Sequence, residues 1–232
     1  MAVSSDKQLN SEQLAAINHK DGPLLIIAGA GTGKTTVITE RIKHLITTGV
    51  ANPEQILALT FTEKAAREMQ ERVDAALPFG YSSMWIMTFH TFSERILKKE
   101  ALHVGLNPRY HLMNEAESIQ FVRKNLFNFD LNYFRPLGNP NKFISGMLQH
   151  FSRLQDEDIS PDEYFDWVKS KLKTQKSKST EEEGLEIKKW NELAMSYKTY
   201  TELKTKEGLM DFGDLIVQTL NLFRQRKNIL RE

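Results

Sequence analysis

The feature that most constrains this chain of 232 residues is the stretch LLIIAGAGTGKTT at positions 24–36. Four apolar residues run into a loop rich in glycine, and an amphipathic stretch follows. This order is typical of a P-loop, in which glycines let successive backbone N–H groups turn towards one anion. The strict pattern G-x-x-x-x-G-K-[ST] is missed at one position, because Ala28 stands where the pattern has glycine.

The residues after the glycines supply the remaining parts of a phosphate site. A helix that starts beside the loop aims its positive end at the bound anion. Lys34 adds a full charge for the β- and γ-phosphates, and Thr35 offers a hydroxyl to Mg²⁺. A glycine-rich turn without function explains the glycines, but not Lys-Thr at the mouth of a helix. The sequence therefore predicts that the chain binds a nucleoside triphosphate.

Three short apolar segments, each followed by an amphipathic stretch, organise the first hundred residues. The pattern predicts strands over 24–28, 56–61 and 84–88, with helices over 34–48, 63–77 and 90–100. Strands that alternate with helices in this way form a parallel sheet covered by helices, an α/β fold. The loops 29–33, 62–63 and 89–91 then follow the carboxyl ends of the strands, so we expect them along one ligand-binding edge.

Residues 106–206 show helical periodicity alone, which predicts an all-helical insertion. Asn114, followed by Glu115 and Glu117, indicates a helix start, and Ser160-Pro161-Asp162-Glu163 is a capping box. The polar segment 170–184 reads as a mobile surface loop. Helical apolar stripes, which we interpret as core, comprise Phe143, Ile144, Met147, Leu148, Phe151 and Leu154, and also Trp190, Leu193, Ala194, Tyr197, Tyr200 and Leu203.

Composition excludes several classes of protein. No apolar run reaches the roughly 18 residues that cross a bilayer, and the first residues contain no apolar signal core, so we expect a cytoplasmic protein without a membrane partner. Zero cysteines exclude disulfides and thiolate metal sites. The net charge of +1 leaves any nucleic-acid surface to local features.

Two segments, TFTEKAAREM at 60–69 and TFHTFSERIL at 88–97, place Thr-Phe at the end of a predicted strand. A single aromatic residue there could be a core plug. Two of them on the ligand edge of one sheet favour stacking surfaces for single-stranded nucleic acid. Bases stack on such rings, and backbone phosphates meet N–H groups at helix starts.

The motifs together resemble the N-terminal portion of a UvrD/Rep-type superfamily 1A DNA helicase. LNSEQLAAI at 9–17 resembles the family's Q motif, AGAGTGKT its motif I, LTFTEKAAREM its motif Ia and TFHTFSERIL its motif Ib. MDFGDLI resembles the DF-x-DL stretch after the helical subdomain 1B. The resemblance covers almost the whole chain, and the family shares alanine at the position of Ala28.

The resemblance implies a RecA-like P-loop NTPase sheet with helices on both faces. Its domain division is subdomain 1A over 1–105, the helical insertion 1B over 106–206, and a return to 1A over 207–232. It also implies ATP and Mg²⁺ as cofactors, with Gln13 reading the adenine edge, Lys34 and Thr35 as catalytic residues and Thr35 as the metal contact. Thr36 stands where several relatives carry arginine. The implied nucleotide-binding residues are Gln13, Ala28, Gly29, Ala30, Gly31, Thr32, Gly33, Lys34, Thr35 and Thr36.

The resemblance places Phe61 and Thr62 of motif Ia, and Thr88, Phe89 and His90 of motif Ib, on single-stranded DNA. His90 at a helix start has a second interpretation, as a helix cap. The implied activity is that of an ATP-driven 3′-to-5′ DNA helicase, as in DNA repair. Its expected partners are single-stranded DNA, junctions of single- and double-stranded DNA, and a second motor domain in the rest of the chain.

One part of the family's machinery is absent from the sequence. Members hydrolyse ATP with an apolar strand that ends in Asp-Glu, and no such run occurs here. Asp211 and Asp214 lie in a helical stretch, and no kinase catalytic loop precedes Asp211-Phe212-Gly213. We therefore expect the chain to be a fragment that ends before this strand, and to hydrolyse ATP negligibly by itself.

Three other functions fit part of the sequence. A P-loop kinase or other phosphotransferase shares residues 24–42, but explains neither Thr-Phe element nor the helical insertion. A non-catalytic module that binds ATP and DNA agrees with the missing acidic pair. The motor portion of a helicase–nuclease subunit would carry the same N-terminal motifs. Turnover of ATP and salt-dependent binding of single-stranded DNA separate the first two from a helicase.

Overall fold

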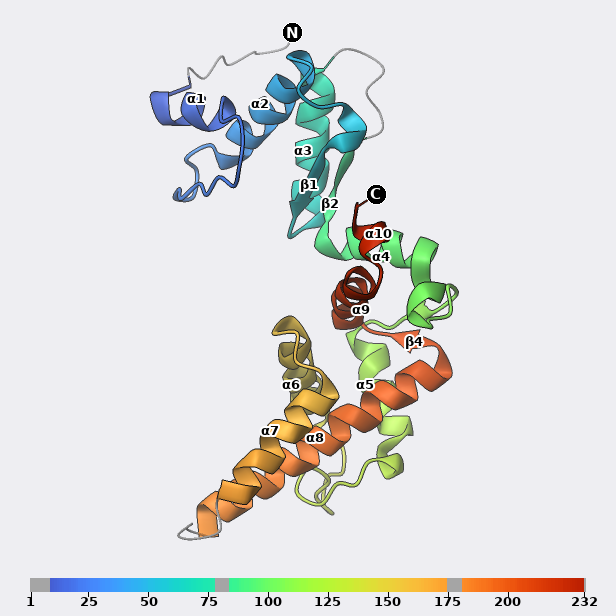
Figure 1. Cartoon of the computed structure of the whole chain (residues 1–232). Helices are drawn as coiled ribbons and strands as arrows, with labels where there is room; N and C mark the ends of the chain where they lie inside the picture. Colours follow the sequence, from blue (N-terminus) through green and yellow to red (C-terminus); the bar gives the residue numbers. More distant parts are fainter. Residues whose placement is uncertain (1–8, 78–83, 175–180, 232) are drawn as a thin grey trace. The chain divides into compact units, whose positions relative to one another are not determined.

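The computed structural model describes residues 9–77, 84–174 and 181–231 (Figure 1). The chain divides into two compact units, Met1–Phe92 and Ser93–Glu232. Each unit has its own hydrophobic cluster, so each is described by itself. No helix among the described residues is long and apolar enough to cross a membrane.

The first unit contains a small parallel sheet with helices packed against it. Its two strands pair in register, from Leu57 opposite Trp85 to Thr60 opposite Thr88. Helix α3 contacts both strands and α2, and α1 contacts α2. The elements are α1 (Ser11–Ile17), α2 (Lys34–Thr47), the 3₁₀ turn η1 (Pro53–Gln55), β1 (Leu57–Thr60), α3 (Glu63–Ala76), β2 (Trp85–Thr88) and the first residues of α4 (Phe89–Glu100).

Two of the three predicted strands and all three predicted helices of this region are confirmed. The predicted strand over 24–28 is wrong, because these residues form no strand. Leu25 is 83% exposed and Ile27 is 90% exposed. A strand needs a neighbour to accept and donate its backbone hydrogen bonds, and no strand among the described residues pairs with this segment. A larger sheet covered by helices on both faces stays a prediction.

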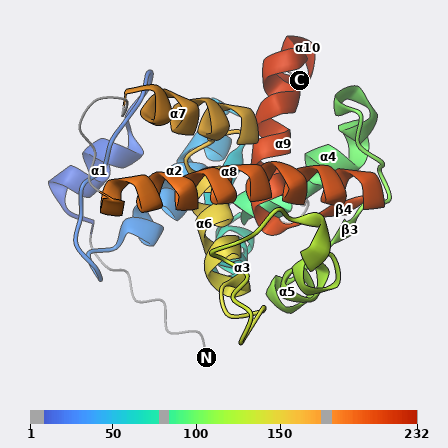
Figure 2. The ribbon, with the colours of Figure 1, turned by 90° about the horizontal axis from the view of Figure 1, so that it is seen from below.

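The second unit is helical, and its longest helix, α8, lies beside α7 in both views (Figures 1 and 2). Strands β3 and β4 form a parallel pair of two residues each. Besides the rest of α4, the elements are η2 (Ala101–Val104), β3 (His111–Leu112), α5 (Glu115–Lys124), η3 (Leu126–Asn128), α6 (Ile144–Asp156), α7 (Pro161–Thr174), α8 (Glu181–Glu207), β4 (Leu209–Met210), α9 (Phe212–Gln225) and α10 (Lys227–Arg231).

Stacked aromatic rings form the centre of the helical unit. Phe151 of α6 is 1% exposed. Its ring stacks on Tyr197 with centroids 5.2 Å apart and on Tyr200 at 5.6 Å. Both predicted apolar stripes therefore face one core, to which α5 contributes Phe121.

Local signals set most helix boundaries in this unit. The helix start predicted at Asn114 is confirmed, and Asn114 forms a capping box with Glu117 at the start of α5. Ser160 and Glu163 exchange hydrogen bonds at the start of α7, where Pro161 is the first residue. The prediction of a surface loop over 170–184 is wrong at both ends, since α7 continues to Thr174 and α8 starts at Glu181; residues 175–180 lie outside the described residues. The polar residues among 170–173 and 182–183 lie on exposed surfaces of these helices, where a polar composition is compatible with helix.

Candidate functional site

The glycine loop before α2 adopts a backbone that only glycine tolerates easily. Gly31 has φ +75° and Gly33 has φ +89°, both in the left-handed region. A Cβ atom added at Gly33 would lie 3.1 Å from Nε2 of Gln13. Helix α2 starts at the next residue, Lys34, so the 14-residue helix directs its N-terminus at the loop.

The side chain of Lys34 folds back into this loop. Its Nζ donates hydrogen bonds to the carbonyl oxygens of Ala28, at 2.9 Å, and of Gly29, at 2.6 Å. The hydroxyl of Thr32 also donates to the Gly29 carbonyl, at 2.8 Å. The loop therefore surrounds one positive charge, and its residues are accessible to an anion from solvent.

Gln13 fastens α1 to the same loop. Its Nε2 donates to the carbonyl of Thr32 at 3.1 Å, and its Oε1 accepts from the backbone N–H of Asn10 at 3.0 Å. Asn10 returns the bond to the N–H of Gln13, which completes a capping box for α1. The structure thus brings Gln13 together with the predicted phosphate residues, while its contact with adenine stays a prediction.

Arg41 is a structural contact of this region that the sequence patterns did not indicate. Its Nη1 donates to the carbonyls of Ala16, Ile17 and His19, at 2.9, 3.1 and 2.8 Å. Ala16 and Ile17 are the last residues of α1 and His19 follows the helix, where carbonyl acceptors are left unsatisfied. Arg41 thereby holds α1 against α2, and only its position on the buried side of a helix could have suggested the role.

A shallow cavity of about 160 Å³ opens beside the loop. Gln13, Thr32 and Lys34 provide its polar wall, and Ile26 and Ile27 its apolar wall. Pockets that enclose a whole ligand measure roughly 300–1,000 Å³. The cavity is therefore too small to enclose a whole nucleotide, whose binding here stays a prediction.

The two Thr-Phe elements lie next to each other at the carboxyl ends of β1 and β2. Thr60 pairs with Thr88, so the following residues, Phe61 and Phe89, leave the sheet at the same level. Phe61 is 91% exposed and Phe89 is 41% exposed, and their ring centroids are 5.5 Å apart. The alternative interpretation of these rings as core plugs is wrong.

Threonine hydroxyls shape the two turns. Thr62 caps α3 by accepting from the N–H of Ala65 at 3.1 Å, and Thr60 accepts from the N–H of Thr62 at 3.2 Å. Thr88 is 5% exposed and accepts from the N–H of Thr91 at 3.1 Å. The hydroxyl of Thr88 therefore serves the turn, whereas His90, also predicted to touch DNA, has an exposed side chain.

Glu63 connects the two turns, and the sequence patterns did not single it out. Its Oε1 accepts hydrogen bonds from the hydroxyls of Thr88, at 2.9 Å, and Thr91, at 2.8 Å. The bond from Thr91, and then that from Thr88, lowers the pKa of this carboxyl. The signal was the equivalent place of Glu63 and Thr91 in the two segments, each in the first turn after Thr-Phe.

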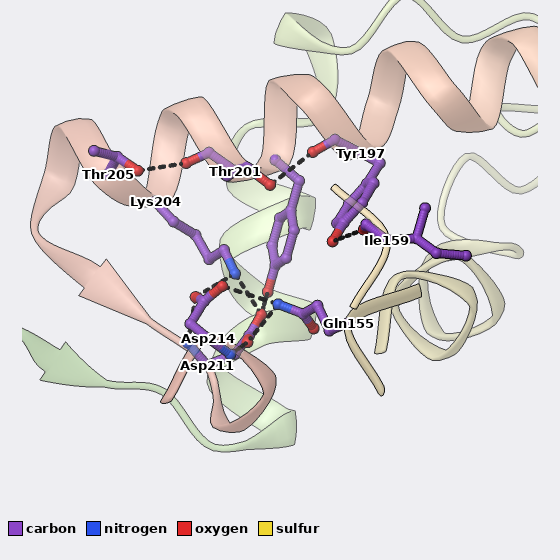
Figure 3. A network of polar contacts seen from close by, with 9 residues as sticks. Gln155, Ile159, Tyr197, Thr201, Lys204, Thr205, Asp211 and Asp214 are labelled. Atoms are coloured by element: carbon purple, nitrogen blue, oxygen red, sulfur yellow. Dashed lines mark hydrogen bonds and ion pairs between the residues drawn. The ribbon is translucent and has the colours of Figure 1, made fainter. Parts of the chain in front are cut away.

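The acidic pair of MDFGDLI lies in the helical unit and has a structural role (Figure 3). Asp211 and Asp214 form the capping box of α9. Both accept from Nζ of Lys204 at 2.5 Å and from Nε2 of Gln155, at 3.0 Å and 2.9 Å respectively. The hydroxyl of Tyr200 donates to Asp211 at 3.0 Å.

Burial and charge act on this network in opposite directions. Lys204 is 1% exposed, so its charge is balanced inside the protein. Burial, the largest single influence, raises the pKa of Asp211, but the charge of Lys204 and the hydrogen bonds from Lys204, the Asp214 N–H and Tyr200 together outweigh it, so the net pKa is lowered. Burial dominates at Asp214, whose pKa is raised. No group of three His, Asp or Glu side chains in the described part of the chain is arranged to hold a metal ion.

Comparison with known proteins agrees with this arrangement of motifs. Residues 9–232 match the model of the UvrD/REP helicase N-terminal domain. The chain is 33% identical over 230 residues to the ATP-dependent DNA helicase PcrA of Bacillus subtilis, covering 96% of this chain and 27% of that protein. It is 35% identical over 228 residues to a probable DNA helicase II homolog of Rickettsia conorii, covering 96% of this chain and 31% of that protein.

A third relative, the ATP-dependent DNA helicase PcrA of Staphylococcus epidermidis, is 32% identical over 221 residues, covering 94% of this chain and 27% of that protein. The chain thus spans about three tenths of the length of these relatives. The match extends through the glycine loop, both Thr-Phe turns and the helical unit. The chain belongs to the family of UvrD/REP helicase N-terminal domains.

Proposed function

We propose that this chain is the part of an ATP-dependent 3′-to-5′ DNA helicase that binds ATP and contributes to the grip on single-stranded DNA. The observation that carries the proposal is the exposed pair Phe61 and Phe89 at the ends of neighbouring parallel strands. An exposed glycine loop with Lys34 in the same unit supports it. The names of the relatives agree with both.

The nucleotide is ATP with Mg²⁺, and the loop residues fit a triphosphate. Left-handed glycines, the start of α2 and the Lys34 ammonium put positive potential at one place. Residues 28–36 hold the phosphates, Thr35 contacts the metal and Gln13 meets the base. When bound, ATP supplies the free energy that drives movement along DNA. Lys34 and the N–H groups orient and neutralise the phosphates.

Two aromatic rings and the residues of the adjoining turns make the DNA contact. Phe61 and Phe89 stack on unpaired bases, each stack contributing about 1–3 kcal/mol. Thr62 and His90 follow the strands, where backbone groups and side chains contact the phosphate–sugar chain. Thr88 contributes at the same place through the turn that its buried hydroxyl holds. Stacking does not select a particular base, and a motor that moves along DNA must bind every base in turn.

The remaining machinery belongs to a longer protein. The sheet of the first unit forms part of a RecA-like motor subdomain 1A (residues 1–105 and 207–232), and residues 106–206 form the insertion 1B. A second motor domain completes the ATP cleft, and the substrates include junctions of single- and double-stranded DNA in the cytoplasm. The 232 residues contain no apolar strand that ends in Asp-Glu, so the isolated chain hydrolyses ATP negligibly.

Steady-state ATPase of the full-length natural protein tests the motor assignment. We expect turnover that rises with single-stranded DNA and is lost in Lys34→Ala, together with unwinding of duplexes with a 3′ tail but not a 5′ tail. The isolated chain should show none of this turnover. DNA-stimulated hydrolysis by the isolated chain, absent in its own Lys34→Ala variant, would contradict the proposed division of labour.

Binding of single-stranded DNA tests the rings separately. Phe61→Ala should weaken binding by roughly 5- to 150-fold, the equivalent of one lost stack. Leu102→Ala, which removes another exposed apolar side chain, is the control. Unchanged DNA binding in Phe61→Ala, with ATP turnover intact, would favour a phosphotransferase. DNA and ATP binding without turnover in the full-length protein would favour a non-catalytic module.

A further inference from the structure

The carboxylate of Glu63 joins the two turns that follow β1 and β2 and carry Phe61 and Phe89. The proposed function assigns no role to this carboxylate. Glu63 lies in the first turn of α3, two residues after Phe61. Its Oε1 reaches the hydroxyls of Thr88, the residue before Phe89, and of Thr91 in the first turn of α4. Glu63 is therefore the side-chain bridge between the segments that carry the two rings.

The backbone pairing by itself does not fix the rings. The ladder between β1 and β2 ends at Thr60 and Thr88, one residue before each phenylalanine. Phe61 is 91% exposed, so little packing restrains its ring besides Phe89. The Glu63 bridge begins where the ladder stops, because Thr88 is both the last paired residue and a donor to Glu63.

The two hydroxyls also stabilise a negative charge that would be unfavourable beside DNA. A carboxylate at the edge where DNA phosphates pass would repel them. Oε1 of Glu63 accepts from two hydroxyls, that of Thr88 at the end of β2 and that of Thr91 in α4, whose oxygens lie 2.9 Å apart. Hydroxyl donors stabilise the carboxylate in place and keep that oxygen turned towards the protein.

We propose that Glu63 is a positioning residue of the single-stranded DNA site, which locks the starts of α3 and α4 together and so holds Phe61 and Phe89 as one stacking platform. This inference rests on the proposed function, since it concerns the same site. Glu63 acts through the rings and does not itself bind DNA. The acceptor oxygen, rather than the negative charge, performs the role.

A double-mutant cycle in the full-length natural protein tests the inference. The probe is a fluorescent oligodeoxythymidylate for affinity, with a 2-aminopurine base to report stacking. We expect Glu63→Ala to weaken binding by roughly three- to tenfold and to reduce 2-aminopurine quenching, a part of the loss expected from one missing stack. Glu63→Gln keeps an acceptor for both hydroxyls and should bind within about twofold of the natural protein.

The decisive measurement is the coupling between Glu63 and the ring. In a Phe61→Ala background, Glu63→Ala should cause little further loss, because there is no ring left to hold. Glu68→Ala, an exposed carboxylate on the same helix, is the matched control and should leave binding unchanged. If Glu63→Ala does not fold, Thr91→Val, which removes one of the two donors, replaces it in the cycle.

The outcomes separate this inference from the proposed function. Loss of binding in Phe61→Ala, with no loss in Glu63→Ala or with fully additive losses, overturns the positioning role and leaves the DNA site standing. Failure of Glu63→Gln to restore binding also overturns it. Unchanged binding in Phe61→Ala overturns the DNA site itself, and the role of Glu63 with it.

Discussion

Two apolar segments of this chain have opposite fates. Residues 24–27, Leu-Leu-Ile-Ile, are among the most apolar in the sequence, yet all four are exposed. The aromatic stripe of α6 and α8 is less uniformly apolar, yet Phe151, Tyr197 and Tyr200 are buried in a stack. Hydrophobicity alone therefore does not decide what becomes core.

The difference follows from how each segment satisfies its backbone. A helix closes its own hydrogen bonds, so α6 and α8 need only bring their apolar faces together. The backbone N–H and C=O groups of a strand form their hydrogen bonds with a neighbouring strand. The helical unit therefore buries its aromatic stripes within its own core, whereas the first unit leaves residues 24–27 and the ring of Phe61 exposed.

The two polar clusters repeat this contrast. Lys204 and Asp214 are buried and Asp211 is partly buried, so the charge of Lys204 must be balanced inside the protein. Glu63 and its two threonines lie at an exposed edge, where water competes for every hydrogen bond. We expect the first cluster to govern stability and the second to govern binding.

Truncation of the aromatic stack should give the largest effect. Phe151→Ala should lower the free energy of unfolding of the helical unit by about 3–5 kcal/mol, since it leaves a cavity between two tyrosine rings. Leu25→Ala, the matched truncation of an exposed apolar side chain, should change stability by less than about 0.5 kcal/mol. Urea unfolding of the 232-residue chain measures both. Equal costs at the two sites would remove the contrast between the units.

Loss of the buried cation should cost nearly as much. Lys204→Met removes one charge and leaves Asp211 and Asp214 without their partner, so we expect a loss of about 3–5 kcal/mol in urea unfolding. Lys206→Met changes an exposed lysine of the same helix and should be nearly neutral. A Lys204→Met protein with an unchanged urea midpoint would show that the aspartates do not need the ammonium.

An intermediate effect is expected where α9 approaches Gln155. A Cβ atom at Gly213 would lie 2.4 Å from Oε1 and 2.7 Å from Cδ of Gln155. Gly213→Ala must therefore displace the side chain that bonds both aspartates, at a cost of about 1–3 kcal/mol. Gly146→Ala, in the open interior of α6, should be neutral or stabilising by up to about 1 kcal/mol. Thermal unfolding ranks the two variants, and the reverse order would contradict the packing at Gln155.

The smallest effect concerns the pH dependence of the exposed cluster. The Thr91 and Thr88 hydroxyls, with a weaker contribution from Arg67, lower the pKa of Glu63 from its ordinary value of 4.5. A lowered pKa means that the contribution of Glu63 to stability is present above the ordinary value. It is lost as the pH falls through the lowered value.

Melting temperatures of the natural protein and of Glu63→Gln, measured between about pH 3 and pH 7, check this sign. The difference between the two proteins should be constant above about pH 5 and should change only below the ordinary pKa of glutamate. Glu68→Gln, on the same helix, should show no such pH-dependent difference. A difference that instead grew as the pH fell would show that Glu63 is not stabilised in its charged form.

Much of the site could be predicted from residue patterns. The glycine loop, α2, both Thr-Phe turns and the capping boxes at Asn114 and Ser160 depend on neighbours within a few residues, and sequence shows those neighbours directly. The prediction of a strand over 24–28 could not be judged this way, because a strand of a parallel sheet depends on a neighbour far away in the sequence, and no described strand pairs with this segment. The sequence prediction missed the helical residues beyond position 170, because it interpreted their polar composition as a loop. Packing of α7 on α8 stabilises the helix there.

The sequence by itself determined the local chemistry of this protein: which residues can cradle a phosphate, which begin a helix, and which rings can meet a base. Only the tertiary structure decided that Glu63 bridges two turns separated by 28 residues in the chain, and that Lys204 closes the acidic pair of α9. Local chemistry is set by covalent neighbours and their preferred dihedral angles. Pairing of distant side chains depends on the register of β1 with β2 and on helix packing, which arise only when the chain folds.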